Sequence, residues 1–111
     1  MKGAFLGEFE EIVLLTVAVL ADEAYGVSVT LEIERQTRRS VAFNNVHTTL
    51  QRLHEKGFLS SKMGGATAER GGRRKRFFKL TAAGGRALKE VRDVRAQLWN
   101  SLPPNVKYLL S

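Results

Sequence analysis

The residues best suited to chemistry lie in the stretch Glu69–Leu80, which is rich in cationic side chains. A glycine-rich turn leads into two phenylalanines, a pattern that predicts the tip of a hairpin entering a strand. Guanidinium and ammonium groups at this density indicate a polyanion as partner. The cationic residues of the stretch are Arg70, Arg73, Arg74, Lys75, Arg76 and Lys79.

Other chemistries find little support in the sequence. The chain has no cysteines, which excludes disulfides, thiol catalysis and cysteine-based zinc sites and fits a reducing cytoplasm. His47 and His54 lack the i,i+4 spacing and the third ligand that a helical metal site requires. Nucleophile elbows, phosphate-binding glycine loops and paired carboxylates in apolar surroundings do not occur. We therefore expect a protein that is not an enzyme and uses no metal or cofactor.

The net charge of +7 is distributed unevenly along the 111 residues. Residues 1–34 hold one lysine against seven acids, whereas residues 35–80 hold twelve bases against two acids. Such asymmetry predicts one acidic and one basic part within a single small fold. The apolar run Ile12–Ala21 is about half the length of a membrane span, so we expect a buried helix and no membrane partner.

The elements that must position the basic stretch follow from apolar spacing and breaker residues. Helices are expected over 9–21, 27–37, 43–56 and 81–102, strands over 58–63 and 73–80, and a very short strand over 40–42. Residues 22–26 are interpreted as a break between the first two helices. Gly57 should end the third helix in the left-handed conformation, Thr81 should cap the start of the fourth, and two prolines at 103–104 should stop it. Three helices followed by a basic two-stranded wing predict an α+β, mainly α fold: a winged helix-turn-helix with an added C-terminal helix. Residues 1–80 would form the DNA-binding domain and residues 81–111 a dimerisation helix and tail.

The expected helix over 43–56 has an apolar stripe of Val46, Leu50 and Leu53, with polar residues around it. Amides can pair with adenine, threonine can meet a thymine methyl and arginine can read guanine. We predict that this helix contacts DNA, with His47 near a phosphate; an ordinary solvated face is the alternative. The predicted contact residues are Asn44, Asn45, His47, Thr48, Thr49, Gln51 and Arg52.

The wing is expected to contact phosphates rather than bases. Acidic residues are missing from the cluster after Glu69, so repulsion within it is unrelieved without an anionic partner. A solvated charge run is the alternative. Phe77 and Phe78 alternate across the strand, so one should face the core. The predicted phosphate contacts are Arg70, Arg73, Arg74, Lys75 and Arg76.

The first and last helices are expected to pair two copies of the chain. The first helix is apolar on nearly all sides, and the last has an apolar stripe with little left to cover it. Trp99 is interpreted as a dimer-core aromatic, with a stacking platform for a flat effector between subunits as the alternative. The predicted dimerisation residues are Phe9, Val13, Leu88, Val91, Val94, Leu98, Trp99 and Leu102.

Four blocks of sequence resemble the PadR family of bacterial transcription regulators over about residues 5–100: LGEFEEIVLLTVAVL at 6–20, AYGVSV at 24–29, VHTTLQRLHEKGFL at 46–59 and GGRRKRFFKLTAAG at 71–84. The resemblance implies a homodimeric winged-helix repressor on a palindromic operator, often released by a small aromatic or drug-like effector. It resembles the small members with one C-terminal helix, in which a tryptophan placed like Trp99 lines a pore at the dimer centre. The family usually has tyrosine where His47 stands and often near Phe78.

The function expected from these patterns is sequence-specific regulation of transcription on double-stranded DNA. A small-molecule sensor and a protein-interaction adaptor that never meets nucleic acid are the alternatives. RNA binding fits less well, because a sheet that stacks single-stranded bases is not evident.

Overall fold

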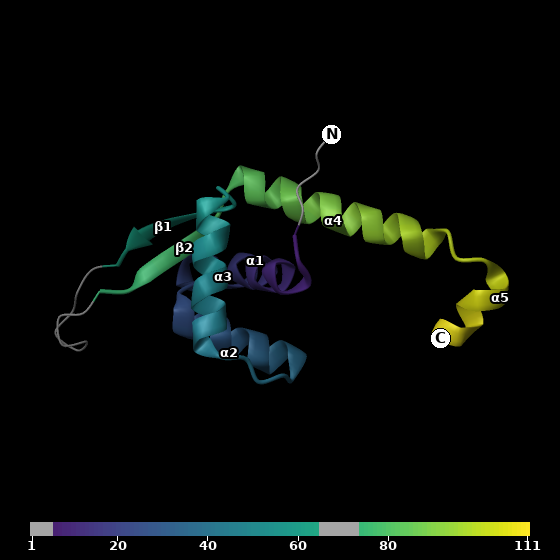
Figure 1. The fold of residues 1–111 in the computed structure, drawn as a ribbon, viewed down its shortest axis with the longest axis horizontal. Coiled ribbons are helices and arrows are strands. Elements are labelled where there is room, and N and C mark those ends of the chain that lie inside the picture. The colour runs from purple at the N-terminus through teal and green to yellow at the C-terminus, as the bar shows by residue number, and fades with distance from the viewer. Residues whose placement is uncertain (1–5, 65–73) are drawn as a thin grey trace.

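Three helices form a bundle that carries a two-stranded hairpin and a long, projecting helix, α4 (Figure 1). The computed structural model describes residues 6–64 and 74–111. In chain order the elements are α1 Glu8–Leu20, η1 Ala21–Glu23, α2 Gly26–Thr37, α3 Phe43–Glu55, β1 Leu59–Met63, β2 Arg76–Leu80, α4 Ala82–Asn100, α5 Pro104–Lys107 and η3 Tyr108–Leu110. This order confirms the predicted winged helix-turn-helix.

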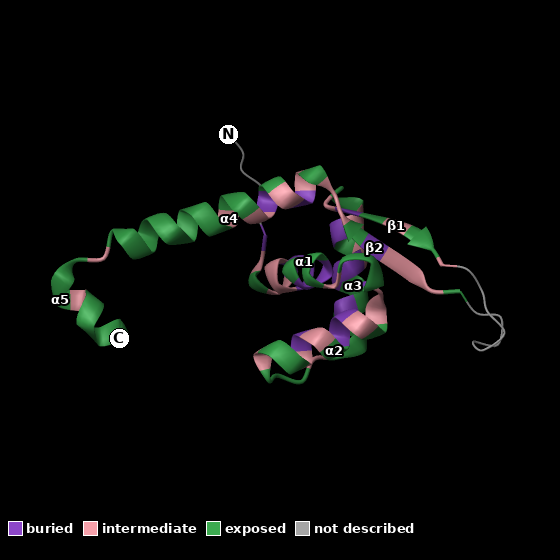
Figure 2. Ribbon diagram, turned by 180° about the vertical axis from the view of Figure 1, so that it is seen from behind, coloured by how far each residue is buried: buried purple, intermediate pink, exposed green. Residues whose placement is uncertain are grey.

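The core lies where α1, α2 and α3 meet, and the inner face of the hairpin closes it (Figure 2). Apolar residues at helical spacing turn one stripe of each helix inward, which removes that surface from water. The predicted stripe of α3 is confirmed, since Val46, Leu50 and Leu53 are all fully buried. Gly57, with a φ of 83°, then ends the helix in the left-handed conformation expected of it.

The hairpin is antiparallel, with Leu59 opposite Leu80 at its base. Phe78 faces the core and is buried, whereas Phe77 lies on the other face, as strand alternation predicts. On its free edge β2 receives one further contact, because the Phe78 amide donates to the Ala24 carbonyl at 2.8 Å. Ala24 thus connects the start of α2 to the base of the hairpin.

The short strand expected over residues 40–42 is not formed. The Val41 amide donates instead to the Glu34 side chain, with 3.0 Å between Val41 N and Glu34 Oε2. A carboxylate therefore satisfies the donor that strand pairing would have used. Strand β2 also starts later than expected: it begins at Arg76, and Arg74 and Lys75 lie before it.

Helix α4 begins against the bundle and then leaves it. The predicted N-cap is confirmed, since Thr81 Oγ1 accepts from the Gly84 amide at 3.0 Å. Ala87 is buried near this end, but every residue from Arg92 to Asn100 is exposed (Figure 2). The prolines after the helix stop it as expected, and two short helical turns that the sequence pattern did not predict follow them.

Candidate nucleic-acid interface

The outer face of α3 is polar and exposed. Asn44, Asn45 and Thr48 are exposed along its first turns, and Arg52 is exposed near its C-terminal end. These side chains carry the amide, hydroxyl and guanidinium groups that hydrogen-bond to base edges. Their predicted exposure is confirmed, and their contact with DNA stays a prediction.

Thr49 does not belong to this face. It is only 4 % exposed, because a rotation of about 100° per residue turns it from Thr48 toward the core. The prediction that Thr49 contacts DNA is therefore wrong. Its position one turn before Leu53 makes it part of the buried side of α3.

His47 is exposed and lies against an aromatic neighbour. Its ring stacks on that of Phe43, with 6.1 Å between the ring centroids and 19° between the planes. Phe43 in turn packs over the start of α2, where a Cβ on Gly26 would lie 2.8 Å from its ring. Stacking on Phe43 therefore positions the His47 ring near the N-terminal end of α3, beside the turn that enters the helix.

Gln51 and Arg76 connect α3 to the hairpin. Arg76 Nη1 donates to Gln51 Oε1 at 2.7 Å, and Arg76 Nε donates to Ser61 Oγ at 3.1 Å. The guanidinium carbon also lies 5.0 Å from the Phe78 ring centroid. Arg76, predicted as a phosphate contact, thus has two of its donors engaged within the protein, and Gln51 is half-buried beside it.

The start of β2 rests on Tyr25, the residue before α2. Lys75 Nζ lies 3.9 Å from the centroid of the Tyr25 ring, and Phe77 meets the same ring edge-on at 5.4 Å. The Gly64 amide donates to the Lys75 carbonyl at 2.5 Å and extends the hairpin by one contact. Arg74 is exposed just beyond. The predicted contacts Arg70 and Arg73 lie outside the described residues.

Sequence reasoning missed the roles of Tyr25 and Ser61. Tyr25 lay in a segment interpreted only as a break between helices, and its ring contacts come from a hairpin about 50 residues later in the chain. Ser61 and Arg76 share one face of the sheet, because Met63 is opposite Arg76 and Ser61 lies two residues from Met63. That alternation is the one signal that could have found Ser61.

The acidic residues of α1 are engaged by basic residues from elsewhere in the fold. Glu11 Oε1 lies 2.8 Å from an Arg95 nitrogen, and Glu10 Oε2 lies 2.9 Å from Lys56 Nζ. Burial raises the pKa of Glu10, but hydrogen bonds from the Gly7 amide and Lys56 outweigh it and bring the pKa below its ordinary value.

Three basic side chains of the wing and α3 contrast with these pairs. Within residues 6–64 and 74–111, Arg52, Arg74 and Lys75 take part in no ion pair. Acidic residues of α1 are therefore paired, whereas these three basic residues are not in ion pairs. The positive charge of these three side chains is therefore not offset by an ion pair within the described residues.

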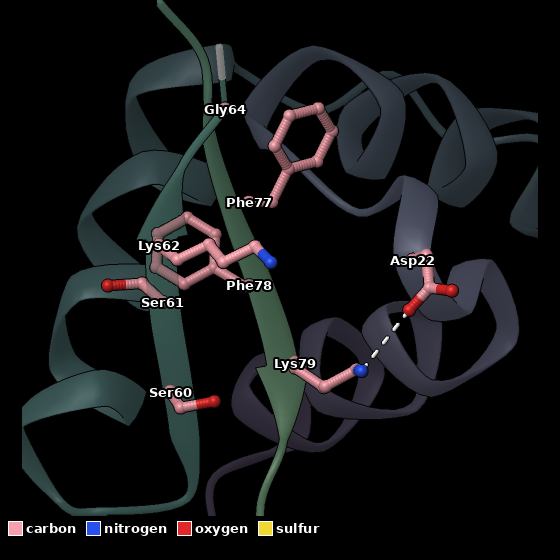
Figure 3. A pocket seen from close by; sticks show the side chains of 8 residues that line it. All are labelled: Asp22, Ser60, Ser61, Lys62, Gly64, Phe77, Phe78 and Lys79. Atoms are coloured by element: carbon pink, nitrogen blue, oxygen red, sulfur yellow. Dashed lines mark ion pairs between the residues drawn. The ribbon is translucent and has the colours of Figure 1, made fainter.

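The other face of the hairpin borders an open cavity of about 640 Å³ (Figure 3). Lys79 and Asp22 form an ion pair across it at 3.3 Å, and both side chains are mostly exposed. The remaining lining residues are Ser60, Ser61, Lys62, Gly64, Phe77 and Phe78. The Lys79–Asp22 pair is exposed to solvent, and an exposed ion pair contributes little energy. It is therefore not the kind of buried polar anchor that a cofactor site uses.

Residues with metal-binding chemistry do not converge in the part of the chain that the structure describes. No group of three or more histidine, cysteine, aspartate or glutamate side chains there could hold an ion. Within the same residues, no helix is both long and apolar enough to cross a bilayer.

The predicted dimerisation residues divide into three groups. Val13 is fully buried within one chain, so its assignment to a dimer surface is wrong: it belongs to the hydrophobic core. Phe9, Leu88 and Val91 are half-buried against the core. The exposed group consists of Val94, Leu98 and Trp99, and Leu102 is half-buried beside them.

Two cavities flank this apolar surface. One of about 660 Å³ lies between α1 and α4 and is lined by Leu15, Leu80 and Leu88 together with charged residues at its rim. A smaller one of about 220 Å³ lies where the C-terminal turns fold back on α4, and it is lined by Leu98, Trp99, Leu102 and Leu110. Trp99 thus borders a cavity within one chain.

Bundle, hairpin and exposed helix face together define a winged helix-turn-helix protein. Residues 14–90 match the transcriptional regulator PadR-like family, so the chain belongs to that family. A search of curated proteins finds no match.

Solved structures agree on the fold. A PadR-like transcription factor from Bacteroides fragilis is 23% identical, with a TM-score of 0.70, and the match covers 84% of each chain. RosR from H. salinarum is 18% identical, with a TM-score of 0.68, over 94% of this chain and 86% of that one. Bacillus subtilis PadR, solved in complex with operator DNA, is 17% identical, with a TM-score of 0.60, over 75% of this chain and 45% of that one.

Proposed function

We propose that the chain regulates transcription by binding double-stranded DNA, with α3 in the major groove and the hairpin along the adjoining backbone. The observation that carries this proposal is the Gln51–Arg76 hydrogen bond, which sets the basic wing directly beside the polar face of α3. Base contacts and phosphate contacts then come from neighbouring parts of one surface. The operator complex of Bacillus subtilis PadR, whose fold is similar, supports this reading.

Salt dependence and two variants test the proposal. Affinity for duplex DNA should fall steeply as ionic strength rises, because phosphate contacts release counterions. Arg74→Ala should weaken binding about equally for all sequences, whereas Thr48→Ala should change the preferred sequence. Lys107→Ala is the matched control, since it removes an exposed cation from α5, away from the proposed surface. If the affinity for duplex DNA changed neither with ionic strength nor on Arg74→Ala, the assignment of the wing as a phosphate contact would be disproved.

The proposed regulator acts as a homodimer. Helix α4 is 19 residues long, and its outer part exposes Val94, Leu98 and Trp99 to solvent in one chain. An apolar stripe of this kind is stabilised when a second copy covers it. A two-fold dimer presents two copies of α3, so the expected operator is palindromic. Repression is the effect expected from the resemblance to the PadR family.

A small planar effector that enters near Trp99 is a second proposed function. The support is the apolar lining of the cavity beside Trp99, although its volume of about 220 Å³ in one chain requires further walls from the partner for a drug-sized molecule. A compound that quenches Trp99 fluorescence and lowers operator affinity would support this function. Failure of a broad panel of planar compounds to do either would count against it.

A protein-interaction adaptor is the competing function. It predicts that neither heparin nor duplex DNA retains the protein at low salt. The charge of the described surface favours the regulator, because Arg52, Arg74 and Lys75 form no ion pair within residues 6–64 and 74–111. Retention measurements on both matrices separate the two functions.

A further inference from the structure

The hydrogen bond between Arg76 and Gln51 determines which way the Gln51 carboxamide faces. Arginine has five N–H donors and no acceptor, so only the amide oxygen can face it. The Nη1–Oε1 distance of 2.7 Å fits a hydrogen bond to a charged donor, which is shorter and stronger than a neutral one. The oxygen of Gln51 is therefore turned toward the wing.

Arg76 itself is held on three sides. Its Nε donates to Ser61 Oγ at 3.1 Å, and its guanidinium lies over the Phe78 ring at 5.0 Å. Phe78 is buried and belongs to the same strand, so the position of the guanidinium is set by the hairpin and not by α3 alone. A side chain restrained in this way pre-organises its partner at low entropic cost.

The amide NH2 group of Gln51 is available to donate hydrogen bonds to a binding partner. Among the described residues, Gln51 Nε2 donates no hydrogen bond, and the side chain is only half-buried. Gln51 lies one turn after the exposed Thr48 and beside the exposed Arg52. The carboxamide thus offers two N–H donors at the edge of the polar face of α3, while its oxygen is turned toward Arg76.

We propose that Arg76 is a positioning residue that makes Gln51 a donor, so that Gln51 selects guanine over adenine at one base pair of each half-site. This inference rests on the proposed DNA-binding function. In bidentate recognition of adenine, the amide oxygen accepts from N6 and the amide NH2 group donates to N7. Guanine presents two acceptors, N7 and O6, which suit a carboxamide whose NH2 group faces the base while its oxygen is turned toward Arg76.

Selection from random duplexes by the purified full-length chain tests the proposal. Gln51→Ala identifies the base pair concerned, because the preference should disappear only there. At that pair the wild type should prefer guanine, and Arg76→Met should shift the guanine-to-adenine ratio about tenfold toward adenine, the scale of one good base contact. Gln51→Glu keeps an acceptor for Arg76 but has no donor, so it should lose guanine and favour cytosine.

Lys75→Met is the matched control. It removes the same charge from the neighbouring residue, whose ammonium rests on Tyr25 and not on Gln51. It should weaken binding to all sequences without changing the preferred base. Equal, sequence-independent losses for Arg76→Met and Lys75→Met would overturn the inference, as would a wild-type preference for adenine.

The remaining outcomes are also decisive. If Arg76→Met fails to fold, as judged by thermal melting, Gln51→Glu decides alone, because it preserves size and the contact to Arg76. Unchanged guanine preference in that variant would overturn the inference. If the wild type selects no duplex DNA, the proposed function fails together with the inference, whereas a sequence-specific wild type with no effect of Arg76 defeats the inference only.

Discussion

Lys75 Nζ lies 3.9 Å from the centroid of the Tyr25 ring, so a basic residue just before the wing's second strand rests on the residue that precedes α2. Phe77 meets the same ring at 5.4 Å and closes the cluster from the strand. The wing is thereby oriented by the helical bundle and not by the two strands alone. A two-stranded hairpin by itself is only marginally stable, which makes this support significant.

Removal of the Tyr25 ring should therefore weaken DNA binding. Tyr25→Ala should lower affinity about two- to fivefold, because a cation–π contact of this kind contributes about 0.5–1 kcal/mol and positions Lys75. Tyr25→Phe keeps the ring and should bind like the wild type. Titrations of one operator with the three proteins at a fixed salt concentration measure the effect. Equal affinity for Tyr25→Ala would show that the ring does not position the wing.

Glu10 should stabilise the fold in a pH-dependent way. Its carboxylate accepts from the Gly7 amide and from Lys56, which lowers its pKa despite burial. Stability from such a group is fully present above the pKa of an unfolded glutamate, about 4.3, and is lost as pH falls through the lower folded value. Glu10→Gln should cost about 1 kcal/mol at pH 7.

The difference between wild type and Glu10→Gln should narrow below about pH 4, where the carboxylate is protonated. Urea unfolding at several pH values measures it. Glu8→Gln is the matched control, since Glu8 is exposed and its contact with Arg39 spans 3.9 Å. It should change stability little at any pH. A pH-independent cost for Glu10→Gln would contradict the assigned ion pair.

Adjacent glycines at the start of α4 should respond oppositely to alanine. A Cβ on Gly84 would collide with the carbonyl oxygen of Phe58, whereas a Cβ on Gly85 would meet only a Leu80 methyl at 3.9 Å. Gly84→Ala should destabilise the protein by about 2 kcal/mol through backbone displacement. Gly85→Ala should stabilise it by up to about 1 kcal/mol through helix propensity. Thermal unfolding of both variants checks the contrast.

A charge placed in the exposed stripe of α4 should separate the proposed dimer. Leu98 is 66 % exposed in one chain, so Leu98→Glu should leave the folded monomer intact but bury an unpaired charge in the dimer. Gln97→Glu adds the same charge about 100° around the helix and should leave assembly unchanged. Sedimentation equilibrium measures the mass. A wild-type monomer would disprove the dimer itself.

Local patterns were sufficient to predict most of the fold. The stripe Val46, Leu50 and Leu53, the cap at Thr81 and the stop at Gly57 each depend on a few neighbouring residues, and each is confirmed. Errors arose where a partner lay farther along the chain or on another element. The expected strand at residues 40–42 is absent because Glu34 bonds to Val41.

The candidate site was predictable as a set of exposed polar and basic residues, but not as a geometry. Composition and helical spacing do not distinguish a free guanidinium from one held by a carboxamide 25 positions earlier in the chain, as Arg76 is. The prediction for Thr49 was wrong for a different reason. It lies one turn before the buried Leu53, so the rotation of the helix turns it toward the core although Thr48 is exposed.

By itself, the sequence determined the element order, the basic wing and the polar face of α3, because hydrophobic spacing, caps and charge are local properties of the chain. Tertiary structure alone decided that Tyr25 supports Lys75 and that Arg76 faces Gln51. These contacts join an inter-helix turn, helix α3 and a strand. Their geometry depends on how the bundle packs, which is a collective result of burial that one-dimensional spacing does not encode.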